Sequence, residues 1–306
     1  MKRIIYIFIF AVIFLSACKK DPSGGIKSHE RAIEAVTLGE GLVQVGPAVV
    51  DRANAKVTVR VLMQDGTSFE NVKPNIQTSY KSTVSPASGE AVNFVAGNNQ
   101  ATYTVKSETG ETREWTVELV PFTEPLLGTF SVNALIVYGG TGPEYGGGGV
   151  VNMVDKPWVW PATGGPAAEL DNTLTFTYTG VTAEGNTTGT VMNNSGADGL
   201  YADFQYILNP ATDVNNFYRK IPKGQGTWVH DYNANKIIFT FADGKTSTAS
   251  FLSAGTVDLG NGKSKTITDN SFSFQLNGTD DWNNIYSDYD KFVKRPRVYF
   301  IDVKKQ

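Results

Sequence analysis

The chain has 306 residues, and its 27 lysine and arginine residues against 30 aspartate and glutamate residues give a net charge of −3. A nucleic-acid-binding protein is expected to carry a strongly basic face, and here short basic clusters occur only near the two ends of the chain, so nucleic acid is not an expected partner. The single cysteine excludes an internal disulfide and a cysteine-rich metal site, so burial of apolar surface must stabilise the fold.

The first residues predict export. A basic head, Met1-Lys2-Arg3, precedes an apolar run, Ile4–Leu15, that is too short to span a bilayer and is typical of a signal peptide over residues 1–17. The order Leu15-Ser16-Ala17-Cys18 resembles the lipobox of bacterial lipoproteins, which implies cleavage before Cys18 and a diacylglyceryl group on its sulfur. A signal peptide followed by a chance cysteine is the alternative. Residues 18–30, rich in charge, proline and glycine, are then expected to form a flexible tether.

The rest of the chain predicts an all-β protein of two domains, because strand-forming residues dominate and the length exceeds one usual core. In the first domain, residues 31–121, Val57, Val59, Val61 and Met63 alternate on one face of a strand. Strands around Tyr103 and Trp115 flank a Thr109–Glu111 turn and predict a hairpin. Short strands at this spacing favour an immunoglobulin-like sandwich, with Trp115 in its core.

The same domain resembles a known module. The segments that carry the resemblance are Val84–Glu90, Val92–Phe94, Ala101–Val105, Gly110 and Trp115–Val117. They are similar to the Ig-like module near the N-terminus of Bacteroidetes surface lipoproteins. The resemblance implies a spacer without catalytic residues.

Two prolines in Pro121–Pro125 end the first domain, and a larger β domain is expected over residues 126–306. Asp243-Gly244 between two apolar runs predicts a hairpin. Helices are expected over 211–218 and 280–292. The pattern favours a jelly-roll sandwich, with a barrel as the alternative. The predicted strands cover residues 128–138, 150–154, 173–179, 200–208, 226–230, 236–241, 247–252, 271–276 and 297–303.

Catalytic motifs are missing from the sequence. There are two histidines, His29 and His230, and no motif of a serine hydrolase, a zinc peptidase or a phosphate-binding loop. A triad with Asp231 is disfavoured because neighbouring strand residues point to opposite faces. The loop carboxylates Glu144, Glu169, Asp280 and Asp281 could form a glycosidase pair, although nothing in the sequence singles them out. No cofactor is expected, and calcium binding by the aspartates of residues 280–290 is disfavoured relative to a solvated loop.

Aromatic residues give the more specific indication. Trp158 and Trp160 lie between prolines, and Trp282 is followed by Asn283 and Asn284, so loops are expected to expose these rings. Sugars stack their C–H faces on indoles and bond their hydroxyls to amides. We therefore predict a ligand site of Trp158, Trp160, Trp282, Asn283 and Asn284, flanked by the 139–149 loop. Core packing is the alternative for each ring, as it is for Trp228.

Together these features predict a lipid-anchored protein on the exterior of the outer membrane that binds carbohydrate and has no catalytic activity. The chain resembles the glycan-binding lipoproteins of Sus-type uptake systems, which implies capture of polysaccharide or oligosaccharide for a TonB-dependent transporter. The membrane contact would be the lipid on Cys18. Attachment to a protein partner is the first alternative, and a glycan-active hydrolase is the second.

Overall fold

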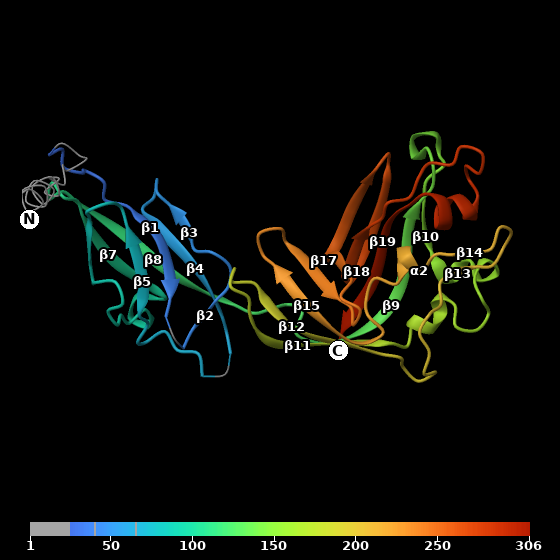
Figure 1. The fold of residues 1–306 in the computed structure, drawn as a ribbon, viewed down its shortest axis with the longest axis horizontal. Helices are drawn as coiled ribbons and strands as arrows, with labels where there is room; N and C mark the ends of the chain where they lie inside the picture. Colours follow the sequence, from blue (N-terminus) through green and yellow to red (C-terminus); the bar gives the residue numbers. More distant parts are fainter. Residues whose placement is uncertain (1–24, 40, 65) are drawn as a thin grey trace, which may run out of the picture. The chain divides into compact units, whose positions relative to one another are not determined.

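The computed structural model describes residues 25–39, 41–64 and 66–306. The chain divides into two compact units (Figure 1). The first contains the described residues up to Leu42 together with Ala48–Val59 and Gly66–Val120, and the second contains Pro121–Gln306 with the short segments Val43–Pro47 and 60–64. The predicted signal peptide and Cys18 lie outside the described residues.

The strands of residues 33–122 form two sheets. A two-stranded antiparallel sheet pairs β1 with β5, and a six-stranded sheet has the order β2-β4-β8-β7-β6 with β3 also paired to β4. The strands are β1 (Ile33–Leu38), β2 (Val43–Gln44), β3 (Val49–Asp51), β4 (Lys56–Leu62), β5 (Pro74–Thr78), β6 (Thr83–Ser85), β7 (Gln100–Lys106) and β8 (Thr112–Phe122), with a short 3-10 helix η1 (Val95–Gly97).

The alternation of valines in β4 is confirmed for Val57, Val59 and Val61, which are buried. Met63 was expected on the same face but is partly exposed, because β4 ends at Leu62 and the strand period no longer applies. The predicted hairpin is confirmed, since β7 and β8 pair with Tyr103 opposite Trp115, and Trp115 is buried.

The second unit is a closed antiparallel barrel of eight strands. Its order is β9-β11-β12-β15-β16-β17-β18-β19, and β19 pairs back onto β9; β10 pairs with the end of β9 (Figure 1). The strands are β9 (Gly128–Gly139), β10 (Gly149–Asn152), β11 (Thr173–Val181), β12 (Thr187–Asn194), β15 (Gly224–Asp231), β16 (Lys236–Thr240), β17 (Thr246–Gly260), β18 (Lys263–Gln275) and β19 (Pro296–Lys305).

The all-β prediction is therefore confirmed, and the barrel alternative is the architecture of this unit. The jelly-roll prediction is wrong, because the barrel strands follow one another as a simple meander without crossed connections. The hairpin at Asp243-Gly244 joins β16 to β17 as predicted. Strand β12 was missed, and the predicted strand over 200–208 is mostly loop that retains only β13 (Gln205–Tyr206).

Aromatic side chains fill the interior of the barrel. Inward positions of successive strands bury large rings that touch edge to face or stack, as Phe176 does with Phe272 at 5.7 Å between ring centroids. An eight-stranded barrel can hold either side chains or one small ligand. Here a cavity among interior side chains such as Leu135 and Tyr299 measures only about 10 Å³, which is too small for a sugar.

A cap of short segments covers one end of this barrel. Because neighbouring strands are antiparallel, the connections that follow β9, β12 and β18 all leave from the same end. We call residues 140–148, 153–172, 195–223 and 276–295 the cap. Its elements are η2 (Pro143–Tyr145), η3 (Met153–Asp155), η4 (Pro157–Val159), η5 (Pro166–Glu169), β13, β14 (Thr212–Asp213), α2 (Asn215–Tyr218) and a π-helix η6 (Asp290–Lys294).

The two predicted helices are much shorter than expected. Of residues 211–218 only α2 is helical, and of residues 280–292 only the end, from Asp288, is helical. Asp281 accepts the backbone N–H of Asn283, which favours a turn over a helix at this position. None of the described helices is long and apolar enough to cross a membrane.

Candidate functional site

A buried aspartate joins two cap segments that are far apart in sequence. Asp290 accepts hydrogen bonds from the backbone N–H of Thr141 at 2.6 Å and from its hydroxyl at 2.8 Å. The same hydroxyl accepts the N–H of Asp281 at 2.7 Å. A charged acceptor in a buried position makes strong hydrogen bonds, so the 140–148 loop and the 276–295 segment are fixed to each other.

This junction places Trp282 against the glycine-rich loop. A β-carbon at Gly142 would lie 2.9 Å from the Trp282 ring, so only glycine fits beneath the indole. The ring of Tyr145 lies 6.1 Å from that of Trp282 at an interplanar angle of 60°, and the Tyr286 hydroxyl donates to the carbonyl of Tyr145. The loop and the tryptophan that were expected to flank one another are thus in contact.

Three exposed rings gather at this contact, and we call Trp282, Tyr145 and Tyr286 the aromatic platform. Their exposed fractions are 56%, 67% and 59%. Large rings exposed side by side are unusual on a soluble surface and indicate contact with a partner or ligand. Sequence reasoning named Trp282 but missed both tyrosines, because their position follows from the fold of the loops.

The backbone of Tyr286 is strained. Its φ of 76° lies in the left-handed region that residues other than glycine rarely adopt. The Lys291 ammonium donates to the carbonyls of Tyr286 and Ser287 and so supports this conformation. Burial lowers the pKa of Lys291. The surrounding structure thus maintains a costly conformation at a residue whose ring is exposed.

The two tryptophans of the 157–161 segment differ from each other. Trp158 is 55% exposed; Lys156 lies over its ring at 5.0 Å and pairs with Asp288 at 3.1 Å, which places Trp158 near the 276–295 segment. Trp160 is only 2% exposed, and its indole N–H donates to the Met153 carbonyl.

This burial corrects the expectation that Trp160 is a ligand residue. Its ring packs edge to face against Tyr206, Tyr218 and Phe292, so it belongs to the part of the hydrophobic core that the cap itself contributes. The flanking prolines did break the regular structure, but they did not turn both indoles outward. Trp228 is likewise fully buried.

An open groove of about 740 Å³ lies beside residues 281–284, which we call the ridge. Three of the four ridge side chains, those of Asp281, Asn283 and Asn284, line the groove. The remaining lining residues come from the 206–210 segment and from the sequence just before and just after the ridge: Tyr206, Leu208, Asn209, Pro210, Thr279, Asp280, Ser287, Tyr289 and Lys294. The predicted residues Asn283 and Asn284 therefore line a groove of a size common for ligand sites.

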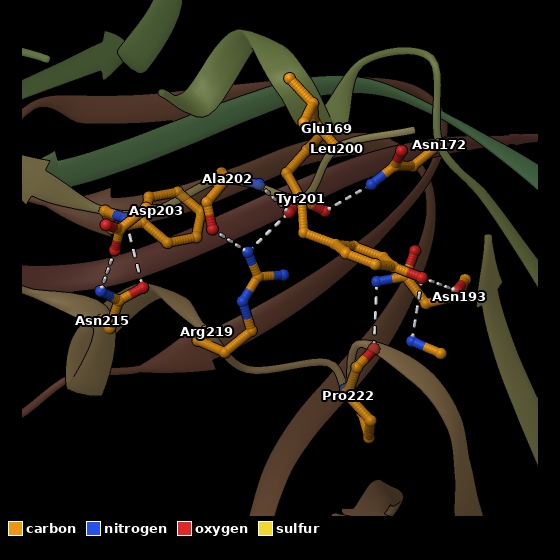
Figure 2. Close-up of polar contacts among 12 residues, drawn as sticks. Glu169, Asn172, Asn193, Leu200, Tyr201, Ala202, Asp203, Asn215, Arg219 and Pro222 are labelled. Carbon is orange, nitrogen blue, oxygen red and sulfur yellow. Dashed lines mark hydrogen bonds and ion pairs between the residues drawn. The ribbon is translucent and has the colours of Figure 1, made fainter. Parts of the chain in front are cut away.

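A buried ion pair between Glu169 and Arg219 lies close in sequence to the groove-lining segment 206–210, and Figure 2 shows its hydrogen bonds. Glu169 accepts from the Arg219 guanidinium at 2.7 Å and from the N–H of Ala202 at 2.8 Å, while Asn172 donates to its second oxygen at 3.0 Å. Arg219 also donates to the Ala202 carbonyl. These bonds fix the start of the 200–214 segment, which continues into the groove wall at Tyr206 and Leu208.

Two other ionisable groups named from the sequence, Asp280 and His230, have structural partners. Asp280 pairs with Arg295 at 2.8 Å, and His230 contacts Glu124 at 3.1 Å rather than Asp231. Among the described residues, no three His, Cys, Asp or Glu side chains converge as metal ligands.

The comparisons with known proteins concern mainly the N-terminal unit. Residues 41–119 match the family described as "SGBP, N-terminal", which is roughly a quarter of the chain. No curated protein matches the chain. Six chains of known structure match it.

Three of the similar structures come from Bacteroides species, and two of them have provisional names. One, from Bacteroides fragilis NCTC 9343 and provisionally named a secreted protein, is 15% identical, covers 30% of this chain and 95% of its own, and has a TM-score of 0.25. The other, from Bacteroides thetaiotaomicron VPI-5482 and provisionally named a glycoside hydrolase, is 13% identical, covers 92% of this chain and 84% of its own, and has a TM-score of 0.28. Sequence identities and TM-scores this low support no conclusion about function.

Proposed function

We propose that this chain is a carbohydrate-binding protein of the cell surface, in which the cap of the barrel binds polysaccharide. The observation that carries the proposal is the aromatic platform of Trp282, Tyr145 and Tyr286 beside a polar groove. Rings provide stacking surfaces for sugar C–H faces, and amides and carboxylates accept and donate to hydroxyls. The match of residues 41–119 to the SGBP N-terminal family supports the same class of function.

In this proposal the N-terminal unit is an Ig-like spacer, and a lipid on Cys18 holds the protein on the outside of the outer membrane. The polysaccharide would be delivered to a TonB-dependent transporter. Replacing Cys18 with Ala is expected to release the protein into soluble fractions. Continued retention of the Cys18→Ala protein in the membrane fraction would contradict the lipid anchor.

A hydrolase is not proposed, because two of the four loop carboxylates named from the sequence are held in ion pairs with arginines. Glu169 is buried and occupied by Arg219, and Asp280 is neutralised by Arg295. A glycosidase needs two carboxyl groups facing the scissile bond, one of them with a raised pKa.

Attachment to a protein partner is the weaker alternative. An adhesin is expected to present a broad apolar patch. The apolar outer face of the barrel at Tyr138, Val298 and Phe300 is instead buried, with Leu252 and Leu259 of the β17–β18 hairpin packed against it.

The experiment is affinity electrophoresis of the full chain through gels that contain soluble starch, dextran, laminarin, xylan, mannan or pectin. At least one gel is expected to retard the protein. Trp282→Ala and Tyr145→Ala are each expected to weaken that binding by about 1–3 kcal/mol, the range for loss of an interface residue. Thermal melting of both variants should stay close to that of the unmodified chain, because the rings are exposed.

Tyr80→Ala is the matched control. Tyr80 is also an exposed tyrosine, but it lies in the N-terminal unit, so its loss should leave the retardation unchanged. Unchanged mobility in every gel, or equal weakening by Tyr80→Ala and Tyr145→Ala, would refute the proposed surface.

A further inference from the structure

The ridge separates two surfaces of different chemistry. The Trp282 side chain packs against Gly142 and Tyr145 and belongs to the aromatic platform. Its neighbours Asp281 and Asn283 line the groove instead. The platform and the groove are therefore adjacent. Of the four consecutive ridge residues, Trp282 belongs to the platform and the other three line the groove.

The groove offers polar groups that the fold does not use. Within the described residues, the side-chain amides of Asn209 and Asn283 make no hydrogen bond, and Lys294 forms no ion pair. The Lys294 ammonium lies over the ring of Tyr289 at 5.7 Å. These groups come from two cap segments, 206–210 and 279–294, so a ligand rich in hydroxyl groups that lies in the groove could bond to both.

The groove also contains apolar surface. Leu208 is partly exposed, and both Leu208 and Pro210 line the groove. A lining that combines aliphatic surface with a few free polar groups suits one or more sugar units, each of which has C–H faces and hydroxyl edges. The groove is open to solvent, so a chain can continue out of it.

We propose that the platform and the groove are two subsites for one extended ligand, a linear oligosaccharide segment that crosses the ridge. This inference rests on the proposed function and adds to it the class of ligand: an internal stretch of several sugar units rather than a single sugar or a chain end. A ligand that already occupies the platform binds the groove at a high effective concentration, so affinity rises with chain length until both subsites are filled.

The test is calorimetric titration of the full chain with homologous oligosaccharides, from the disaccharide to the hexasaccharide, prepared from the polysaccharide that retards it most. The affinity is expected to rise by about tenfold or more over this series. The double variant Leu208→Ala/Asn283→Ala removes one lining group from each of the two cap segments that form the groove. It should lose that gain for the hexasaccharide, and its affinity for the disaccharide should fall by much less.

Trp282→Ala is the comparison variant. It should weaken the binding of oligosaccharides of every length in the series, because it removes the stacking subsite. Equal affinity for the disaccharide and hexasaccharide, or a double variant that binds the hexasaccharide normally, would overturn the two-subsite inference while leaving the proposed function intact. Failure of every polysaccharide and oligosaccharide to bind would overturn both. Melting curves of each variant confirm that the fold is preserved.

Discussion

The barrel wall and the cap contain the same types of aromatic residue, but the wall buries their rings whereas parts of the cap expose them to solvent. In the wall, Phe176 alternates with threonines along β11 and Trp228 lies on the buried face of β15, and the period of two sends both rings into the core. In the cap, Trp282 and Tyr286 lie in irregular segments, and hydrogen bonds from distant loops determine that they face water. Orientation in the wall is thus local, whereas orientation in the cap depends on tertiary contacts.

The largest effect is expected where the cap itself joins the core. Trp160→Ala removes a ring that packs against Tyr206, Tyr218 and Phe292 and should cost about 3–5 kcal/mol of unfolding free energy. Trp158→Ala, two residues away, should change it by no more than about 0.5 kcal/mol because that ring is exposed. Urea unfolding of both variants measures the difference, and equal losses would contradict the assignment of Trp160 to the core.

The contact between the two cap loops should have the next largest effect. Asp290→Ala leaves the N–H and hydroxyl of Thr141 without their acceptor in a buried position, which should cost about 1–3 kcal/mol. It should also weaken glycan binding, because Trp282 and Tyr145 are no longer fixed against each other. Unfolding curves and affinity gels report the two effects.

Asp288→Ala is the control for this prediction. Asp288 lies in the same segment, but its pairing with Lys156 is close to the surface and is expected to contribute less than about 1 kcal/mol. An Asp290→Ala protein as stable as Asp288→Ala would show that the loops are held together by other contacts.

The sequence predicted the wall better than the cap, and the reason is visible at particular residues. Alternation located β11 and the β16–β17 hairpin, but β12 was missed because Gly189 and its threonines lack apolar alternation. Gly189 is required there, since a β-carbon would lie 2.8 Å from the Trp228 indole nitrogen. No local pattern encodes a contact with a strand that lies almost forty residues further along the chain.

The residues of the candidate site were predicted only in part. Composition near Trp282 indicated an exposed ring beside amides, and the structure places Asn283 and Asn284 in the groove. Tyr145 and Tyr286 could not be named, because their proximity depends on Asp290, 149 residues after Thr141 in sequence. Proline-flanked tryptophans gave a misleading signal for Trp160, since flanking prolines disrupt a strand without deciding which face is buried.

The opposite end of the barrel offers a pH test. Burial raises the pKa of Glu124, but hydrogen bonds from His230 and Tyr232 outweigh it and hold the pKa below its usual value of 4.5. A carboxyl whose folded pKa is depressed contributes stability that is complete above its unfolded pKa and is lost as pH falls through the folded value. The unfolding free energy is therefore expected to decline below about pH 4.5.

Glu124→Gln separates this contribution from those of the other carboxyl groups. The variant should be less stable at neutral pH and should lose less stability than the unmodified chain on acidification, as measured by urea unfolding between neutral and acidic pH. Parallel pH profiles for the two proteins would mean that Glu124 does not titrate with a depressed pKa. Glycan binding at neutral pH should be unaffected, because Glu124 lies away from the cap.

The smallest expected change in stability concerns Tyr286, whose φ of 76° suits glycine better than tyrosine. Tyr286→Gly relieves this strain but loses ring contacts, so the unfolding free energy should stay within about 1 kcal/mol of the unmodified value. Glycan affinity should nevertheless fall, because one of the three rings of the platform is gone. Tyr286→Phe keeps the ring and removes only the hydrogen bond to Tyr145, and it should bind nearly normally. If Tyr286→Gly binds as tightly as Tyr286→Phe, the strained tyrosine is not part of the binding surface, and the platform is reduced to Trp282 and Tyr145.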